Sequence, residues 1–335
     1  MKKTVLLTTL FLLIFSNLFA AAGTTSASFL KIGVGARNLA LASVGAVNRD
    51  VNSIYYNPSG LCFLDQSELS VMNLQWLQDI NYQHAAFADP KYGLGASVSY
   101  LSMGDIDKYD VNDTLVGKFS AHDFAGTAAY ACGLRKDLFL GLAVKYISSQ
   151  MDDAVAWTMA GDVGATYTGL KNVTLGAVVQ NMGGGLKFVS EEDMLPLTFK
   201  VGGEYLWNYK RDITPRFYAE ITKSAELDPY VSVAAESEFT IKDNLGYVLR
   251  AGYRSRDKEG NTVGFSAGAG MFINSLRVDL AWVPYGELGN TLAMSLNLKF
   301  GFMKEKNKEE ETPSNEQSVE TLQQGTQAQP EERKP

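Results

Sequence analysis

The chain has 335 residues, of which 46% are hydrophobic and 20% are charged, and its formal net charge is −7. An acidic chain of this kind lacks the basic excess of nucleic-acid-binding proteins, so we expect no nucleic-acid partner. Its two histidines, His84 and His122, stand far apart without a second ligand at metal-binding spacing. That spacing argues against a histidine metal site and against a histidine-dependent catalytic triad.

Residues 1–22 have the pattern of a secretory signal peptide. Lys2 and Lys3 precede the apolar stretch "TVLLTTLFLLIF", and Ala20 and Ala22 fit the small-residue cleavage pattern. The apolar stretch is too short for a membrane-spanning helix. Because no cysteine follows the cleavage site, a lipoprotein is not expected. We therefore expect an exported protein, whose formal charge becomes −9 once the two lysines are removed.

Residues 23–62 are rich in glycine and alanine and end in "DVNSIYYNPSGL" (50–61). We expect Asp50 to begin a short helix that Asn57 and Pro58 end. Pro58 and Gly60 would then turn the chain into the next segment. The adjacent tyrosines, Tyr55 and Tyr56, are expected to pack against the inner wall of the larger structure formed by the residues that follow. The candidate motif comprises Asp50, Tyr55, Tyr56, Asn57, Pro58, Ser59 and Gly60.

Residues 67–302 repeat with a period of two, which a strand keeps on one face and a helix cannot. In residues 92–100, for example, Tyr92, Leu94, Ala96, Val98 and Tyr100 alternate with glycine and serine. We expect about 14 strands, starting near residues 67, 80, 91, 119, 137, 155, 172, 196, 215, 229, 245, 262, 275 and 290.

A soluble β-sandwich would also alternate, but three features favour a transmembrane barrel. The export signal and the chain length suit it. The apolar faces often end in aromatic residues, as the interface girdles of membrane barrels do. The connections also alternate in length, which is typical of short periplasmic turns and longer external loops. Short turns are expected at 89–91, 135–137, 169–171, 242–244 and 274–275. Longer loops are expected at 102–118, 183–195, 254–262 and 283–290. The predicted fold is an all-β, antiparallel transmembrane barrel.

The opposite face of the strands carries small residues and a few charges, which are tolerated only if they face the lumen. We interpret Lys200, Glu204, Arg250, Arg277 and Asp279 as a paired polar network of the lumen; an acid–base site is the alternative. A barrel of this size has more interior than small side chains fill. Residues 23–62 are therefore expected to fold into the lumen as a hatch or plug.

Other motifs offer little chemistry. "GVGARN" (33–38) lacks the third glycine and the βαβ context of a nucleotide loop. The aspartate-rich segment 104–113 lacks EF-hand spacing and is expected to be a solvated acidic loop rather than a calcium site. Cys62 and Cys132 are expected to be thiols rather than a disulfide. Without a recognisable nucleophile setting, we expect no enzyme, no cofactor and no metal.

Four stretches together resemble the PorV/PorQ family of FadL-like outer-membrane barrels. They are the N-terminal stretch 27–61, "LGAVVQNMGG" (175–184), "LPLTFKVGGEY" (195–205) and "VDLAWVPYGELGNTLAMSLNLKF" (278–300). The resemblance covers residues 27–302. Two features depart from it: Ser59 stands where the family usually has alanine, and a tail continues past Phe302.

The resemblance implies a 14-stranded outer-membrane barrel with an N-terminal hatch, in contact with outer-membrane lipid. It also implies one of two roles. The first is a conduit for hydrophobic small-molecule ligands, and the alternative is an accessory or shuttle barrel of type IX secretion that binds secreted cargo proteins at its external loops. The expected domains are a signal peptide (1–22), a hatch (23–62), a barrel (63–303) and a disordered periplasmic tail (304–335).

Overall fold

The computed structural model describes residues 25–77, 80–188, 190–210, 212–242, 244–255, 264–285 and 289–301. The expected signal peptide and the expected tail lie outside these residues. Among the described residues, no helix combines the length and the apolar composition needed to cross a bilayer.

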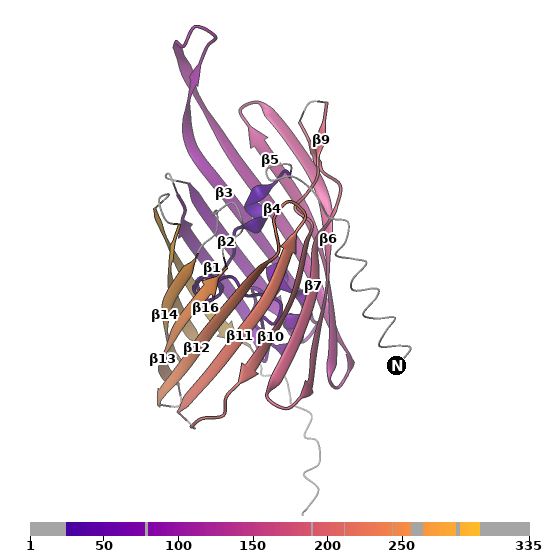
Figure 1. Cartoon of the computed structure of the whole chain (residues 1–335), viewed down its shortest axis with the longest axis vertical. Helices are drawn as coiled ribbons and strands as arrows, with labels where there is room; N and C mark the ends of the chain where they lie inside the picture. The colour runs from indigo at the N-terminus through magenta and orange to yellow at the C-terminus, as the bar shows by residue number, and fades with distance from the viewer. Residues whose placement is uncertain are drawn as a thin grey trace, which may run out of the picture. The chain divides into compact units, whose positions relative to one another are not determined.

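Fourteen antiparallel strands close into one barrel (Figure 1), which confirms the predicted fold class. The first and last strands pair with each other, from Ser67 with Phe300 to Gln75 with Leu292. The observed strand starts lie close to the expected ones; the largest difference is at β4, expected near 119 and beginning at Leu115. The wall strands are β1 (Ser67–Gln75), β2 (Asn81–Asp89), β3 (Leu94–Tyr109), β4 (Leu115–Arg135), β5 (Leu138–Met151), β6 (Ala154–Leu170), β7 (Val173–Gly183), β10 (Thr198–Leu206), β11 (Ile213–Ser224), β12 (Tyr230–Lys242), β13 (Leu245–Arg254), β14 (Phe265–Ile273), β15 (Leu276–Pro284) and β16 (Asn290–Phe300).

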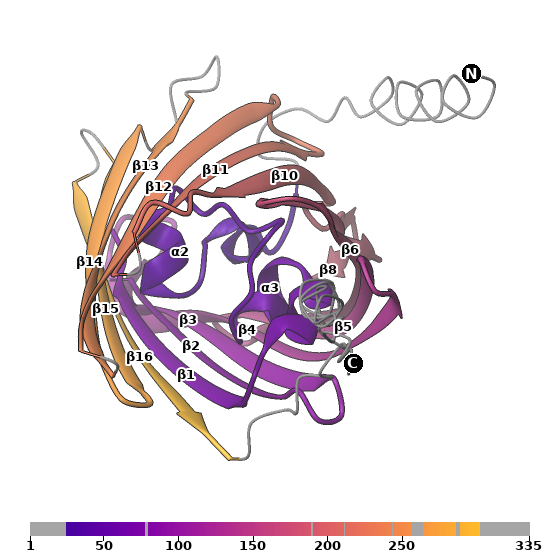
Figure 2. The ribbon, with the colours of Figure 1, turned by 90° about the horizontal axis from the view of Figure 1, so that it is seen from below.

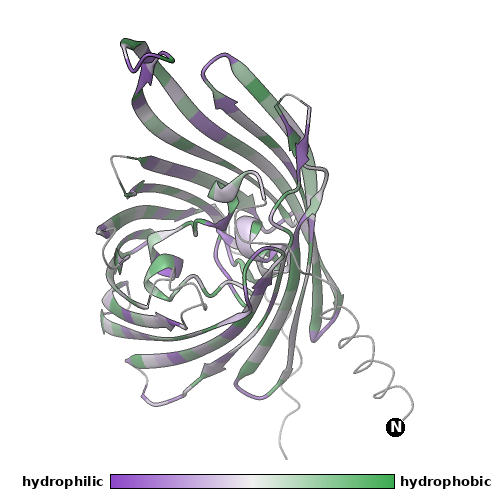
Figure 3. Ribbon diagram, turned by 45° about the horizontal axis from the view of Figure 1, so that its top comes forward, coloured by the Kyte–Doolittle hydropathy of each residue, from purple (hydrophilic) through white to green (hydrophobic). Residues whose placement is uncertain are grey.

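The outer face of the wall is apolar. Hydropathy alternates along the strands (Figure 3), as a wall with one lipid face and one inner face requires. In β16, for example, Leu292, Met294 and Leu296 are exposed, whereas Ser295 is fully buried. Exposed aromatic residues are frequent on the same face, including Tyr100, Tyr146, Trp157, Tyr253 and Trp282.

The barrel has two unlike ends. The five expected short turns all fall at the end where β1 begins and β16 ends, which we call the turn end. The longest connections, 184–197 and 255–264, fall at the opposite end, which we call the loop end.

The expectation of a loop at 102–118 is wrong. β3 and β4 continue beyond the wall as a hairpin, with Tyr109 paired to Leu115 and a bulge between Ser102 and Asp105. This hairpin rises past the other strands in Figure 1. The charged residues of this segment hide its strand periodicity, because strands outside the membrane can carry charge on both faces. The segment 183–195 likewise contains a short sheet of β8 (Leu186–Lys187) and β9 (Glu192–Asp193).

Residues 25–64, called the N-terminal segment below, lie inside the ring of strands (Figure 2). They form η1 (Ser28–Lys31), α2 (Ala36–Ala40), α3 (Ser53–Tyr56) and η2 (Pro58–Phe63). Most of their side chains are buried. The barrel core is therefore built between this segment and the inner wall, rather than among the wall residues alone.

Wall glycines let the backbone of the segment approach closely. A Cβ atom on Gly176 would lie 1.9 Å from the Ala46 carbonyl oxygen, and one on Gly141 would lie 2.1 Å from the Ser59 nitrogen. On Gly164 it would lie 2.0 Å from Asn57 Oδ1. These inward glycines of β5, β6 and β7 are contact points for the segment, not empty space.

Gly176→Val should therefore displace the segment and destabilise the barrel. Overpacking of a filled core costs about 1–3 kcal/mol, so the thermal unfolding midpoint of the detergent-solubilised barrel should fall by several degrees. The control is Gly126→Val on the outward face, where the nearest atom to a Cβ is a Phe124 ring carbon at 3.4 Å. Equal midpoints for both variants would contradict this contact.

Candidate functional site

The candidate motif at 50–60 lies fully inside the lumen, but it does not begin as expected. Asn52, not Asp50, is the N-cap residue of α3, and it makes no side-chain cap. Asp50 acts two residues earlier: its Oδ1 accepts from the Asn52 nitrogen at 2.9 Å, and its Oδ2 pairs with Arg37 at 3.1 Å. Asp50 therefore joins this turn to α2.

The adjacent tyrosines connect the segment to itself as well as to the wall. The Tyr55 hydroxyl lies 2.6 Å from the carbonyl oxygens of Leu30 and Ile32. The Tyr56 hydroxyl accepts from the Val34 nitrogen at 2.9 Å. On the wall side, the Gln180 amide donates to the carbonyls of both tyrosines, at 2.7 and 3.0 Å. α3 thus contacts residues 30–34 through the hydroxyl groups of its two tyrosines.

Asn57 to Gly60 form an anchor against the wall. Asn57 Nδ2 donates to the carbonyls of Ala46 at 2.6 Å and Ala165 at 3.3 Å. The Ser59 hydroxyl lies 2.8 Å from the Thr166 hydroxyl. A Cβ on Gly60 would meet the Asn48 carbonyl at 2.1 Å, so this glycine is required by packing. Pro58 starts η2 instead of turning the chain directly into β1, which corrects the expected turn.

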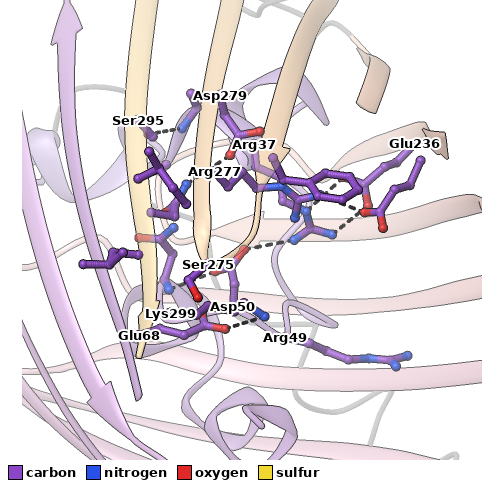
Figure 4. Close-up of a pocket in the computed structure, with 18 of the residues that line it drawn as sticks. Arg37, Arg49, Asp50, Glu68, Glu236, Ser275, Arg277, Asp279, Ser295 and Lys299 are labelled. Carbon is purple, nitrogen blue, oxygen red and sulfur yellow. Dashed lines mark hydrogen bonds and ion pairs between the residues drawn. The ribbon is translucent and has the colours of Figure 1, made fainter. Parts of the chain in front are cut away.

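A polar pocket of about 400 Å³ lies between the segment and the wall and extends to the turn end (Figure 4). Five cationic and five acidic side chains line it, and each has an oppositely charged partner within 4.0 Å. These residues are Arg37, Arg49, Arg216, Arg277, Lys299, Asp50, Glu68, Glu236, Glu238 and Asp279.

Glu236 on β12 is the centre of this pocket's ion pairs. Its carboxylate meets Arg250 at 2.6 Å, Arg37 of α2 at 3.0 Å and Arg216 at 3.4 Å. Arg250 continues to Asp279 at 2.8 Å, and both of these side chains are almost fully buried. A single carboxylate on the wall therefore holds an arginine of the N-terminal segment and two arginines of the wall.

The five expected lumen residues point inward, and three of them belong to one chain of ion pairs. Arg216 lies 4.0 Å from Glu204 and 3.4 Å from Glu236, and Glu236 in turn meets Arg250. Arg250 pairs with Asp279, and Glu204 also pairs with Arg49 of the segment at 3.2 Å. Lys200 and Arg277 pair outside this chain, with Glu220 at 3.6 Å and with Glu238 at 2.8 Å respectively.

Sequence reasoning missed Glu236 and Arg37, and it gave the lumen-facing Glu220 no partner. Glu220 Oε2 accepts from the backbone nitrogens of Gly45 at 2.8 Å and Ala46 at 2.7 Å. Glu236 follows Ser232 and Ala234 in the inward row of β12, and a charge at that position could have marked it. The partners of both glutamates in the segment carry no such signal, because residues 36–46 show no strand periodicity.

Residues 25–32, called the strap below, close the loop end. The Ser26 nitrogen donates to the Met194 carbonyl at 3.0 Å, and the Thr25 nitrogen donates to Glu226 at 3.2 Å. The Lys31 ammonium forms an ion pair with the same Glu226 carboxylate. The strap thus makes its polar contacts with the two loops that carry Met194 and Glu226. The rest of the segment makes its polar contacts with the barrel through the wall strands.

Apolar side chains surround the strap. Phe29 and Leu30 are buried in the largest hydrophobic cluster. Half-buried residues packed against that cluster include Trp76, Ile80, Met103 and Tyr285. Around the strap the lumen is thus mostly apolar, with the Lys31–Glu226 pair at its edge, whereas the pocket toward the turn end is charged.

The fold resembles solved structures of transport barrels, although no known family profile and no curated protein matches the sequence. The toluene transporter TbuX of Ralstonia pickettii shares 11% identity at a TM-score of 0.53 and covers 80% of this chain and 99% of its own. The toluene transporter TodX of P. putida shares 9% at 0.53, with the same coverage. A Pseudomonas aeruginosa FadL homologue shares 10% at 0.50, covering 81% and 99%.

The chain therefore has the closed, 14-stranded architecture of FadL-like outer-membrane channels. Identities near 10% show a shared fold and say nothing about a shared ligand. The finer resemblance to PorV/PorQ proteins stays a prediction.

Glu236→Gln should destabilise the barrel strongly, because it leaves three arginines beside a neutral group. Breaking a buried ion pair costs about 3–5 kcal/mol. Glu238→Gln, two residues along β12, removes a partly exposed pair and should cost about 1 kcal/mol or less. Urea unfolding of both variants in detergent checks this; similar losses would contradict a central role for Glu236.

The strap contact should weaken in acid. Burial raises the pKa of Glu226, but hydrogen bonds from Lys31 and Thr25 outweigh burial and lower this pKa below its ordinary value of 4.5. A carboxylate with a lowered folded-state pKa stabilises the contact above its unfolded pKa, and this stabilisation is lost as the pH falls through the folded-state pKa.

A spin label on Ser28→Cys, in a Cys62→Ala/Cys132→Ala background, should therefore gain mobility as the pH falls below about 4.5. With Glu226→Gln the label should be mobile at every pH. A label whose mobility depends on pH equally in both proteins would show that another group is responsible.

Proposed function

We propose that this protein is an exported outer-membrane conduit for hydrophobic small molecules, with the N-terminal segment as its hatch. The observation that carries the proposal is the apolar loop end of a lumen closed by a short strap. The shared fold supports it, since TbuX and TodX are toluene transporters. On this proposal the signal peptide exports the chain, the loop end faces outward and the turn end faces the periplasm.

The apolar cluster around Phe29 and Leu30 is the proposed capture site. An apolar molecule entering from outside gains roughly 25 cal/mol for each Å² of apolar surface removed from water. Trp76, Met103 and Tyr285 are half-buried at this cluster, so they can contact a ligand before the strap moves.

The strap is the proposed moving part, and the Asn57–Gly60 motif is the fixed part. A hinge at the motif would break the Asn57 and Ser59 contacts with β6 and remove Gly60 from its close packing. Releasing the strap breaks its loop contacts and the hydroxyl contacts of Tyr55. Gly35, which has φ +77°, follows the strap and is a suitable hinge.

The charged pocket is the proposed exit side. Its charged side chains are paired with one another, so an apolar molecule finds no favourable contact there. An apolar ligand that reaches this side would therefore not be retained in the pocket before it leaves toward the periplasm.

A second proposed role follows from the resemblance to PorV/PorQ proteins. The β3–β4 hairpin exposes Tyr109, Val111, Leu115 and Val116 beyond the wall. Exposed apolar residues on a projecting element favour a protein partner. As an accessory barrel of type IX secretion, the protein would bind exported cargo with this hairpin. Shortening the hairpin to residue 102 and residue 119 would then abolish cargo capture without changing small-molecule uptake.

Weakening the strap should speed the uptake of an apolar probe. In Gram-negative cells producing the barrel, Lys31→Ala or Glu226→Gln should raise the initial rate of 1-N-phenylnaphthylamine uptake about two- to five-fold. This factor corresponds to the roughly 0.5–1 kcal/mol of a partly exposed ion pair.

Lys118→Ala, which removes an exposed 3.9 Å pair with Asp107 on the hairpin, is the control and should match the wild type. If cells with the wild-type barrel, the strap variants and no barrel take up the probe equally fast, the protein is not a conduit for apolar molecules.

A further inference from the structure

A groove of about 520 Å³ crosses the outer face of the wall over β16, β1, β2 and β3. It runs between two outward rows of residues that are in register across the four strands. The row nearer the turn end is wholly apolar and consists of Leu296, Val71, Ala85 and Val98. The row nearer the loop end consists of Met294, Asn73, Gln83 and Tyr100.

The groove exists because Ala85 has a small side chain. It is half-buried, whereas the outward neighbours Val71 and Val98 are exposed. The small side chain of Ala85 leaves a hollow between these two valines, and the backbone of β1 and β2 forms its floor.

Two carboxamides lie on the lipid-facing wall of this groove. Asn73 and Gln83 are exposed cross-strand neighbours, and the side chain of neither forms a hydrogen bond with another described residue. In a bilayer, a polar group without a partner is costly, because hydrocarbon offers no hydrogen bond. Gln75 and Asn81, the next outward residues toward the loop end, are carboxamides as well, so Asn73 and Gln83 are the deeper pair of a polar row that borders the apolar one. The corresponding outward positions of other strands are mostly apolar or aromatic, such as Tyr146, Trp157 and Trp282. As the pair next to the hydrocarbon, Asn73 and Gln83 call for a partner from outside the barrel.

The order of polar and apolar groups indicates the partner. Asn73 and Gln83 lie two residues from the loop-end termini of β1 and β2, and the apolar row lies deeper along the strands. A lipid of the outer leaflet presents the same order, with its ester or amide linkages above its acyl chains. A carboxamide both donates and accepts, so it can bind such a linkage and the hydroxyl groups near it.

We propose that this groove is a specific site for one acyl chain of an outer-leaflet lipid, with Asn73 and Gln83 bound to the linkage of that chain. The assignment of the loop end to the outside rests on the proposed function, whereas binding at the groove does not depend on uptake through the lumen. The site lies on the exterior of the wall, and the charged pocket lies inside it.

Native mass spectrometry of the detergent-solubilised full-length barrel, titrated with lipid A, an outer-leaflet lipid with ester- and amide-linked acyl chains, tests the proposal. The wild type should bind one lipid, and Ala85→Leu, which fills the groove, should weaken that binding at least ten-fold. Asn73→Leu with Gln83→Leu keeps the bulk but removes the amides, and should weaken binding several-fold. The matched control is Ala251→Leu, an exposed outward alanine on β13, which should bind like the wild type.

Equal lipid binding by all four proteins, or no bound lipid on the wild type, would overturn the proposal. A dimer that Ala85→Leu dissolves would also overturn it, in favour of a second copy of this chain on the groove. Because Ala85 faces away from the lumen, Ala85→Leu should leave probe uptake unchanged. Lipid loss with unchanged uptake therefore separates this site from the conduit, and retained heat-modifiable mobility on gels verifies that each variant is folded.

Discussion

A closed barrel of fourteen strands encloses more volume than its inward side chains fill, and the rest of this structure answers that constraint. The N-terminal segment occupies the interior, but its backbone brings unpaired amides and carbonyls that need partners. The wall supplies them with small polar side chains and carboxylates. Ser295 accepts from the Ala36 nitrogen at 2.8 Å, and Glu220 accepts from two successive nitrogens. Wall glycines give the backbone of the segment room to approach, and wall side chains then hydrogen-bond that backbone.

This fit divides the N-terminal segment by the nature of its contacts. Residues 36–64 are held by ion pairs with wall carboxylates, by hydrogen bonds with wall hydroxyls and by close contacts with wall glycines. Releasing them would leave these carboxylates and the backbone polar groups of the segment without partners. The strap is held by loop contacts, one ion pair and the tyrosines of α3. The stretch 50–61 belongs to the fixed part, yet Tyr55 also contacts the strap. The stretch 50–61 therefore supports the proposed moving strap and is not itself the moving part.

Much of the wall could be predicted from sequence, because alternation along a strand follows directly from the side-chain period. The strand starts, the apolar exterior and the inward direction of Arg250 and Asp279 all follow from it. The β3–β4 hairpin was missed because its sequence carries charged residues on both faces, a pattern that indicates a loop unless the strands extend beyond the membrane. The partners of Glu236 were missed for a different reason. Arg37 and Glu236 are 199 residues apart, and only the three-dimensional path of the segment brings them together.

The division into a fixed part and a releasable strap is tested most directly by hydrogen–deuterium exchange of the full-length barrel in nanodiscs, with and without toluene. The account predicts slow exchange of residues 36–64 under both conditions. It also predicts faster exchange of the strap, residues 25–32, which toluene increases further. Uniformly slow exchange that toluene does not change would contradict it, and would make the segment a fixed plug of the barrel.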